Sequence, residues 1–175
     1  MPLESSELKS ANLFSVAGKT AVLTGASGFL GRTFVRALLA NGARVVALGR
    51  SERLLPEAEA WSREFGPEFI SIHRVDMYNI ADLRRVLDQI ATDEKSIDIL
   101  VNNAHELGPG TGFNVPEGSL ESATMDTWMR NLTGGVYWAA LTTQILGARM
   151  KQRGSGSIIN ISTMYALVAP RPQLY

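Results

Sequence analysis

Gly25, Gly28 and Gly31 are the residues of this 175-residue chain whose type and spacing point most directly to chemistry. Glycine tolerates backbone angles that other residues avoid, and it lets a ligand come close to main-chain N–H groups. A helix that begins at such a turn presents those N–H groups together with the positive end of its dipole. The spacing therefore predicts a binding site for a phosphate or diphosphate group.

The segments that must position these glycines stand directly on either side of them. Residues 20–24 form an apolar, β-branched run of a strand's length, and residues 32–40 carry apolar side chains at helical spacing. A glycine triplet alone is an ordinary turn, whereas strand, glycine turn and helix together indicate a dinucleotide site. We therefore expect the main chain between Thr24 and Gly31 to hold a diphosphate.

Strand-like and helix-like segments alternate along the rest of the chain. Strands are expected at 20–24, 44–48, 69–75, 97–101 and 157–162, and helices at 32–40, 51–65, 80–90 and 125–152, with Asn79 as the cap of the third helix. This alternation predicts an α/β fold of the Rossmann type, a doubly wound parallel sheet with helices on both faces. Residues 1–12 are expected to form a flexible tail and residues 13–175 one dinucleotide-binding domain.

Composition and charge exclude several classes of partner. The formal net charge is zero, which removes the electrostatic case for nucleic acid or an anionic membrane surface. The chain has no cysteine and two histidines, so we expect neither disulfides nor a metal site. No apolar run approaches the roughly 20 residues of a membrane span. These features fit a cytoplasmic protein with a small-molecule substrate.

The residues at the carboxyl ends of the predicted strands bear on the choice of coenzyme. An NAD site needs a carboxylate after the second strand to hold the ribose 2′-OH, but this chain has Gly49 followed by Arg50 there. A guanidinium favours the 2′-phosphate of NADP, with NAD as the alternative, unless Arg50 is a plain surface arginine. Asp76 could accept a hydrogen bond from the adenine amino group, or it could be a helix-start carboxylate. The expected cofactor contacts are Gly25, Ser27, Gly28, Phe29, Leu30, Gly31, Arg50, Asp76, Met77, Asn103 and Ala104.

Taken in order, the motifs of the chain resemble those of the short-chain dehydrogenase/reductase family, in its simple single-domain branch. The matching segments are 24–31, Asp76, 102–104, 131–134 and 156–162. Residues 156–175 are most similar to the sugar-acid and polyol oxidoreductases of the gluconate 5-dehydrogenase type. The resemblance implies an NAD(P)-dependent hydride transfer between nicotinamide and a carbonyl or alcohol carbon, in a homo-oligomer that is a dimer or tetramer.

The same resemblance implies three catalytic side chains. Asn131 corresponds to an asparagine that supports a water relay, Thr163 stands where the family has a serine that holds the substrate oxygen, and Tyr175 is close to the place of the general acid–base tyrosine. In the family, a lysine four residues after that tyrosine lowers its pKa from the ordinary value near 10. An alternative is that a tyrosine beyond Tyr175 is the catalytic one.

Departures from the family pattern leave other functions open. His105 replaces the last glycine of the third motif, Thr163 replaces the serine, and residue 175 is the last of the sequence, so the lysine and the family's final strands and helices are missing. We therefore expect an amino-terminal part of an enzyme with little turnover alone. A non-catalytic nucleotide-binding member of the family is one alternative. A nucleotide-sugar epimerase or dehydratase, suggested by the glycine spacing, is another.

Overall fold

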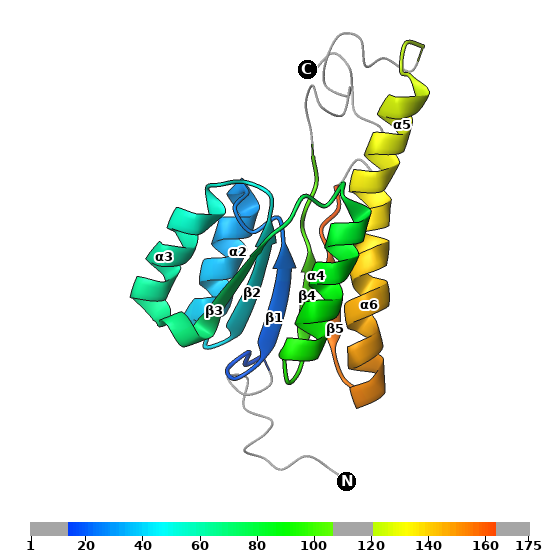
Figure 1. Ribbon diagram of the computed structural model, residues 1–175. Helices are drawn as coiled ribbons and strands as arrows, with labels where there is room; N and C mark the ends of the chain where they lie inside the picture. Colours follow the sequence, from blue (N-terminus) through cyan, green and yellow to red (C-terminus); the bar gives the residue numbers. More distant parts are fainter. Residues whose placement is uncertain (1–13, 107–120, 164–175) are drawn as a thin grey trace.

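A five-stranded parallel sheet forms the centre of the computed structural model, which describes residues 14–106 and 121–163 (Figure 1). Its strands are β1 (Thr20–Thr24), β2 (Arg44–Gly49), β3 (Ile70–Arg74), β4 (Ile99–Asn102) and β5 (Ser157–Asn160). They lie in the order β3-β2-β1-β4-β5, and every neighbouring pair is parallel. The chain runs outward from β1 to β3 and then crosses back to β4. The carboxyl end of β1 is therefore the switch point at which such sheets bind ligands.

Helices cover both faces of this sheet. On one face lie α2 (Phe29–Ala40) and α3 (Leu54–Phe65), and on the other lie α4 (Ile80–Asp93) and α6 (Trp138–Arg153) (Figure 1). Successive strand residues point to opposite faces, so Val22 packs in the cluster with α4 and α6, and Leu23 in the cluster with α2 and α3. The doubly wound α/β fold expected from the sequence is thus confirmed.

Most element boundaries follow local signals in the sequence. Asn79 caps α4, its side-chain oxygen accepting a hydrogen bond of 3.1 Å from the Asp82 N–H. Pro56 lies in the first turn of α3, where its missing N–H costs nothing. The helix α2 begins at Phe29, earlier than the expected start at Arg32, because the end of the glycine turn already has helical geometry.

The single long helix expected over residues 125–152 is interrupted, which corrects that prediction. The chain forms α5 (Met125–Leu132), then the π-turn η4 (Thr133–Tyr137), then α6. A π-turn shifts the helical register, so apolar spacing carried across it does not stay on one face. Leu146 and Met150 are buried, whereas Leu132 and Val136, which unbroken helical spacing would place on the same apolar face, are 51% and 62% exposed.

The helix α5 extends past the carboxyl edge of the sheet (Figure 1). Its exposed apolar side chains are Met125, Trp128, Met129 and Leu132. Among the helices of residues 14–106 and 121–163, none combines the length and hydrophobicity that crossing a bilayer requires. The tail predicted at 1–12 and the candidate catalytic Tyr175 lie outside the described residues.

Candidate functional site

The turn after β1 has a backbone that requires glycine at two positions. Gly25 has φ +70°, in the left-handed region that side chains disfavour. A Cβ on Gly31 would lie 2.1 Å from the Gly25 carbonyl oxygen. The Gly28 N–H also donates to that oxygen at 3.0 Å, which closes the turn. The glycines expected to bind phosphate are therefore needed to form the turn itself.

The turn leads directly into the N-terminus of α2. Gly28 is the N-cap residue, no side chain caps the helix, and its first turn contains no acidic residue. The first N–H groups of a helix have no partners within it, so they are available to a ligand. Phe29, Leu30 and Gly31 all line the adjacent cleft. The local geometry and charge fit a diphosphate group.

Residues after β4 hold the turn in place. The Asn103 side-chain amide donates to the carbonyl oxygens of Thr24 at 3.1 Å and Gly25 at 3.2 Å. In return, the Thr24 hydroxyl oxygen accepts hydrogen bonds from the N–H groups of Asn103 at 3.1 Å and Ala104 at 3.0 Å. This mutual arrangement fixes the segment after β4 against the glycine turn, and it explains why an asparagine stands at position 103.

A cleft of about 600 Å³ opens at this switch point. All of the cofactor contacts predicted from the sequence line it: Gly25, Ser27, Gly28, Phe29, Leu30, Gly31, Arg50, Asp76, Met77, Asn103 and Ala104. Residues that sequence reasoning did not select also line it: Gly49, Ser51, Arg53, His105, Glu106 and Trp138. The volume is within the range of small-molecule and cofactor sites. Contact of these residues with a coenzyme remains a prediction.

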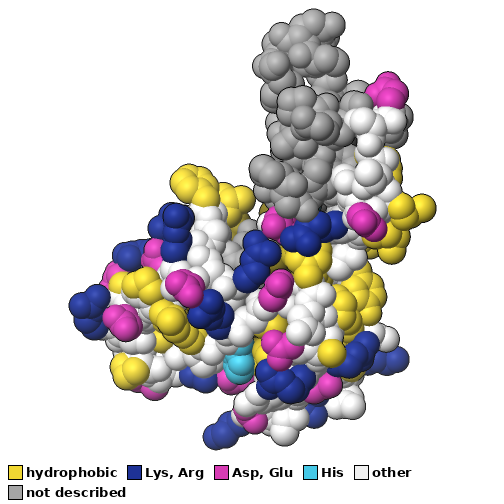
Figure 2. All heavy atoms as spheres, turned by 45° about the horizontal axis from the view of Figure 1, so that its top comes forward, with side chains coloured by type: hydrophobic (Ala, Val, Ile, Leu, Met, Phe, Trp, Pro, Cys, Tyr) yellow, Lys and Arg dark blue, Asp and Glu magenta, His cyan; other side chains and the backbone are white. Residues whose placement is uncertain are grey.

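Charged side chains meet across the cleft. Glu106 forms ion pairs with Arg50 at 3.2 Å and with Arg130 of α5 at 2.9 Å. Burial opposes ionisation of Glu106, but hydrogen bonds from Tyr78 and Arg50 and the two nearby arginine charges hold its pKa below the usual value. Figure 2 turns the carboxyl edge of the sheet toward the reader, and basic and acidic side chains lie side by side in the middle of that face.

Two aromatic rings pack next to this charged group. The Arg130 guanidinium lies 3.8 Å from the centre of the Tyr78 ring. The Tyr78 ring in turn makes an edge-to-face contact with Trp138, and the centres of the two rings are 4.6 Å apart. Burial and a hydrogen bond to Glu106 raise the pKa of Tyr78 to about 12. Trp138 is 6% exposed, and its Nε1 has no hydrogen-bond partner among the described residues. Sequence reasoning did not select either ring, because their contact joins segments that are distant in the sequence.

Asp76 combines a local role with a place in the cleft. Its carboxylate accepts a hydrogen bond of 3.1 Å from the Tyr78 N–H, which shapes the turn after β3. The helix cap that the sequence also allowed for Asp76 is provided by Asn79 instead. Asp76 is exposed and Met77 is buried, and both line the cleft. The proposed contact of Asp76 with an adenine amino group is thus sterically open.

A second hollow adjoins the cleft and shares its lining at Ala104, His105 and Trp138. Its other walls are the ends of β4 and β5 and the π-turn η4, a feature that is frequent at functional sites. The Asn102 side chain is fixed beneath it by hydrogen bonds from Thr142 at 2.6 Å and to Asn160 at 2.8 Å. The hollow therefore offers polar groups of Asn102, Thr143 and Asn160 within a largely apolar lining next to the cleft.

Of the predicted catalytic residues, Asn131 and Thr163 do not line this hollow, and Tyr175 lies outside the described residues. Asn131 lies on α5, one turn before the glycines that line the hollow, and its amide donates to the Thr127 carbonyl at 2.9 Å. Thr163 follows β5 and is exposed, next to Ser162, which lines the hollow. The catalytic roles of Asn131, Thr163 and Tyr175 remain predictions.

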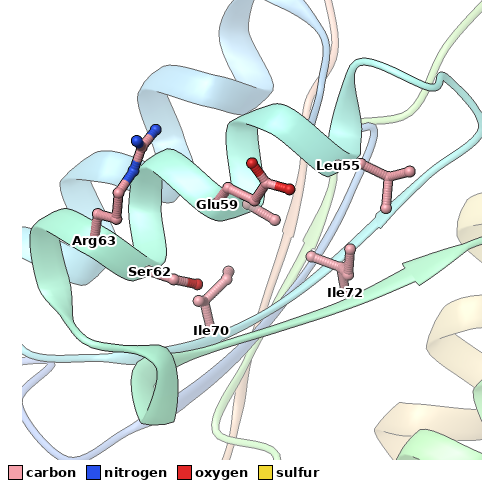
Figure 3. Close-up of a pocket in the computed structure, with 7 residues that line it drawn as sticks. Leu55, Glu59, Ser62, Arg63, Ile70 and Ile72 are labelled. Atoms are coloured by element: carbon pink, nitrogen blue, oxygen red, sulfur yellow. The ribbon is translucent and has the colours of Figure 1, made fainter.

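An apolar groove lies away from the site, between α3 and the edge strand β3 (Figure 3). Leu55 and Ile72 face each other across it, and Ser62 lies near Ile70. The groove touches neither the glycine turn nor the charged group around Glu106. Among the described residues, no three His, Asp or Glu side chains gather as a metal site would require.

Comparisons with known proteins agree with this geometry. The family model described as short chain dehydrogenase matches residues 19–174. Gluconate 5-dehydrogenase of Gluconobacter oxydans is 30% identical over 161 residues, 90% of this chain and 58% of that protein. NADP-dependent mannitol dehydrogenase of Hypocrea jecorina is 28% identical over 166 residues, 93% of this chain and 59% of that protein.

Solved structures give the same result. L-sorbose reductase of Gluconobacter frateurii, complexed with NADPH and L-sorbose, matches with a TM-score of 0.77 and 25% identity, covering 90% of this chain and 58% of that one. A Beutenbergia cavernae structure with NADP bound at low occupancy matches with a TM-score of 0.78 and 28% identity, covering 90% and 59%. The chain thus spans little more than half the length of these relatives. It belongs to the short chain dehydrogenase family.

Proposed function

We propose that this chain carries the coenzyme site of an NADP-preferring oxidoreductase. The enzyme would transfer hydride between nicotinamide and a carbonyl or alcohol carbon of a small polar substrate of the sugar-acid or polyol type. The observation that carries this proposal is the cleft in which the glycine turn, the uncapped start of α2 and the Arg50 guanidinium line one space. Proteins of this family bind NAD or NADP.

Each part of the cleft suits one part of such a coenzyme. The N–H groups of residues 29–31 would hold the diphosphate, because they lack side-chain caps and lie at the positive end of α2. Arg50 would hold the 2′-phosphate, and no carboxylate at the end of β2 would repel it. Asp76 would accept from the adenine amino group. The nicotinamide, when bound, supplies the carbon that gives or takes the hydride.

The hollow beside the cleft is the proposed place for the substrate. Its lining includes Asn102, Thr143 and Ser162, whose polar groups suit a hydroxylated molecule. Relatives named NADP-dependent mannitol dehydrogenase, D-threitol dehydrogenase and gluconate 5-dehydrogenase support this substrate class. Asn131, Thr163 and Tyr175, or a later tyrosine, are the proposed catalytic side chains. The exposed apolar side chains of α5 support assembly as a dimer or tetramer.

Coenzyme titration tests the proposal directly. We expect NADPH to bind at least about tenfold more tightly than NADH, a difference of about 1.4 kcal/mol, because of the ionic contact with Arg50. Arg50→Gln should remove the preference, whereas Arg63→Gln, on the far side of α3 in the separate groove, should keep it. Equal affinities in the unaltered protein would contradict the NADP preference, and no binding of either coenzyme would contradict the site itself.

The substrate class is tested by following NADPH consumption or formation. The panel, assayed with the whole protein, should include ketoses, keto-sugar acids, polyols and nucleotide-sugars. We expect turnover with a ketose or keto-acid of this panel and its polyol or hydroxy-acid product. Conversion of nucleotide-sugars without net coenzyme turnover would instead support an epimerase or dehydratase.

A further inference from the structure

Glu106 reaches across the switch point of the sheet to Arg50. Arg50 follows β2 and Glu106 lies beyond β4, and β1 with its glycine turn lies between those two strands. Their ion pair of 3.2 Å therefore connects the two sides of the cleft. Both residues line this cleft. The guanidinium of Arg50, which is proposed to bind the coenzyme, is thus already paired with the carboxylate of Glu106.

The two segments that carry this pair pack closely on the glycine turn. A Cβ built on Gly25 would lie 2.9 Å from the Ala104 Cα, just before Glu106 in the chain. A Cβ built on Gly49 would lie 3.3 Å from the Ser27 hydroxyl oxygen, just before Arg50. The backbone leading to each charged residue is therefore held in place. The ion pair between Arg50 and Glu106 can therefore break by rotation of the side chains, without movement of the backbone.

The two partners of the pair are held unequally. The Arg50 side chain is 54% exposed, whereas that of Glu106 is 19% exposed and has a second arginine partner, Arg130, at 2.9 Å. Loss of the Arg50 contact would therefore leave Glu106 paired and in place. Arg50 is the partner that is free to turn toward another anion, because exposed ion pairs contribute little to stability.

We propose that Glu106 is a specificity-determining residue for the coenzyme, because its carboxylate competes with a 2′-phosphate for Arg50. This inference rests on the proposed coenzyme site. A 2′-phosphate must displace the Glu106 carboxylate from the guanidinium and then lie close to a like charge. A ribose 2′-OH has no such conflict and can donate a hydrogen bond to a carboxylate. Glu106 thus reduces the difference in affinity between NADPH and NADH that Arg50 creates.

The variant Glu106→Gln tests this competition in the whole chain. Calorimetric titration should show NADPH and 2′,5′-ADP binding about three- to tenfold more tightly, since an exposed ion pair and a like-charge repulsion are both removed. The affinity for NADH should change by less than about twofold or should fall. Arg130→Gln should act in the opposite direction on NADPH, because it leaves Glu106 with Arg50 as its remaining arginine partner.

Glu52→Gln is the matched control. Glu52 pairs with Arg74 at 3.2 Å, and Arg74 also donates to the Arg50 carbonyl, so the control removes one carboxylate close to Arg50 without touching the Glu106 pair. Its NADPH affinity should equal that of the unaltered protein. Thermal melts of all variants establish that they are folded.

Three results would overturn the inference. The first is unchanged or weaker NADPH binding by a folded Glu106→Gln protein. The second is a gain in NADPH affinity in Glu52→Gln as large as that in Glu106→Gln. The third is a gain in NADH affinity in Glu106→Gln as large as its gain in NADPH affinity. Failure of the unaltered protein to bind either coenzyme is a different outcome, which removes the proposed function as well. The two failures are therefore distinguishable in the same set of titrations.

Discussion

Replacing Gly31 by alanine tests whether the glycine turn has the form described. The added Cβ would lie 2.1 Å from the Gly25 carbonyl oxygen, 2.9 Å from its carbonyl carbon and 3.0 Å from the Ala26 carbonyl carbon. All three are backbone atoms, so no side chain can turn away. Ordinary van der Waals contacts of carbon are about 3.5 Å or longer. The Gly25 carbonyl oxygen and the new Cβ must therefore move apart by about 1.4 Å.

The cost of this change follows from two opposing effects. Overpacking of a tight site typically costs about 1–3 kcal/mol. Alanine in place of glycine in a helix recovers up to about 1 kcal/mol. We expect the free energy of unfolding to fall by about 2 kcal/mol in urea denaturation. We also expect NADPH affinity to fall about 100-fold, about 2.7 kcal/mol, because the displaced N–H groups would each make a charge-assisted hydrogen bond.

Gly147→Ala is the control for this substitution. It lies within α6, and its Cβ would meet the flexible end of Ile158 at 3.4 Å. The helix should tolerate or gain from alanine there, with NADPH affinity unchanged. If Gly31→Ala had the free energy of unfolding and the NADPH affinity of the unaltered protein, the described geometry of the turn would be refuted.

Three further predictions concern groups around the site and the far edge of the sheet. Burial raises the pKa of Tyr78 to about 12, so the stability that the neutral phenol contributes is present below about pH 10 and is lost as the pH rises through 12. Ultraviolet titration should show one phenol that ionises near pH 12, and Tyr78→Phe should remove that transition. Burial opposes ionisation of Asp98, but bonds from the Thr20 N–H at 2.9 Å and the Ser96 hydroxyl at 3.0 Å, with the Arg153 and Lys19 charges, hold its pKa below the usual value. Asp98→Asn should therefore cost about 1–3 kcal/mol in urea denaturation at pH 7. The cost should shrink as the pH falls below about 4, where the unfolded carboxylate takes up a proton, and it should be lost once the pH falls through the lower pKa of the native carboxylate. Thr142→Val removes the 2.6 Å hydrogen bond to the buried Asn102 oxygen and should cost about 1–3 kcal/mol in thermal melts.

Control variants and a second pH separate these effects from general losses of stability. Tyr137→Phe should leave the late-titrating phenol in place, and loss of that phenol in Tyr137→Phe alone would contradict the assignment to Tyr78. An equal cost of Asp98→Asn at pH 7 and at pH 3 would show that the Asp98 charge is not responsible. Thr133→Val, which removes an exposed hydroxyl bonded within its own helix, should cost less than Thr142→Val.

The fold could be predicted because its signals are local and repeated. The strand at 20–24, the glycine turn and the Asn79 cap each depend on residues close in sequence, and all appear in the structure as expected. The alternation of strands and helices then leaves few ways to connect a parallel sheet. For the same reason, the expected cofactor contacts, which follow the carboxyl ends of the strands, line one cleft.

The rest depended on contacts between distant segments. The helical spacing of residues 125–152 gave no sign of the π-turn η4, which alters the face on which Asn131 and Val136 lie. Glu106 was missed because its importance arises from Arg50 and Arg130, which are distant from it in the sequence. Trp138 was not selected for the site, because its place between the cleft and the adjoining hollow depends on packing against Tyr78, which is distant from it in the sequence.

A crystal structure of the protein with NADPH tests the central claim most directly. The diphosphate should lie within hydrogen-bond distance of the N–H groups of residues 29–31, and the 2′-phosphate should contact the Arg50 guanidinium in place of Glu106. A dinucleotide bound elsewhere, or one whose diphosphate lies away from the glycine turn, would contradict the account.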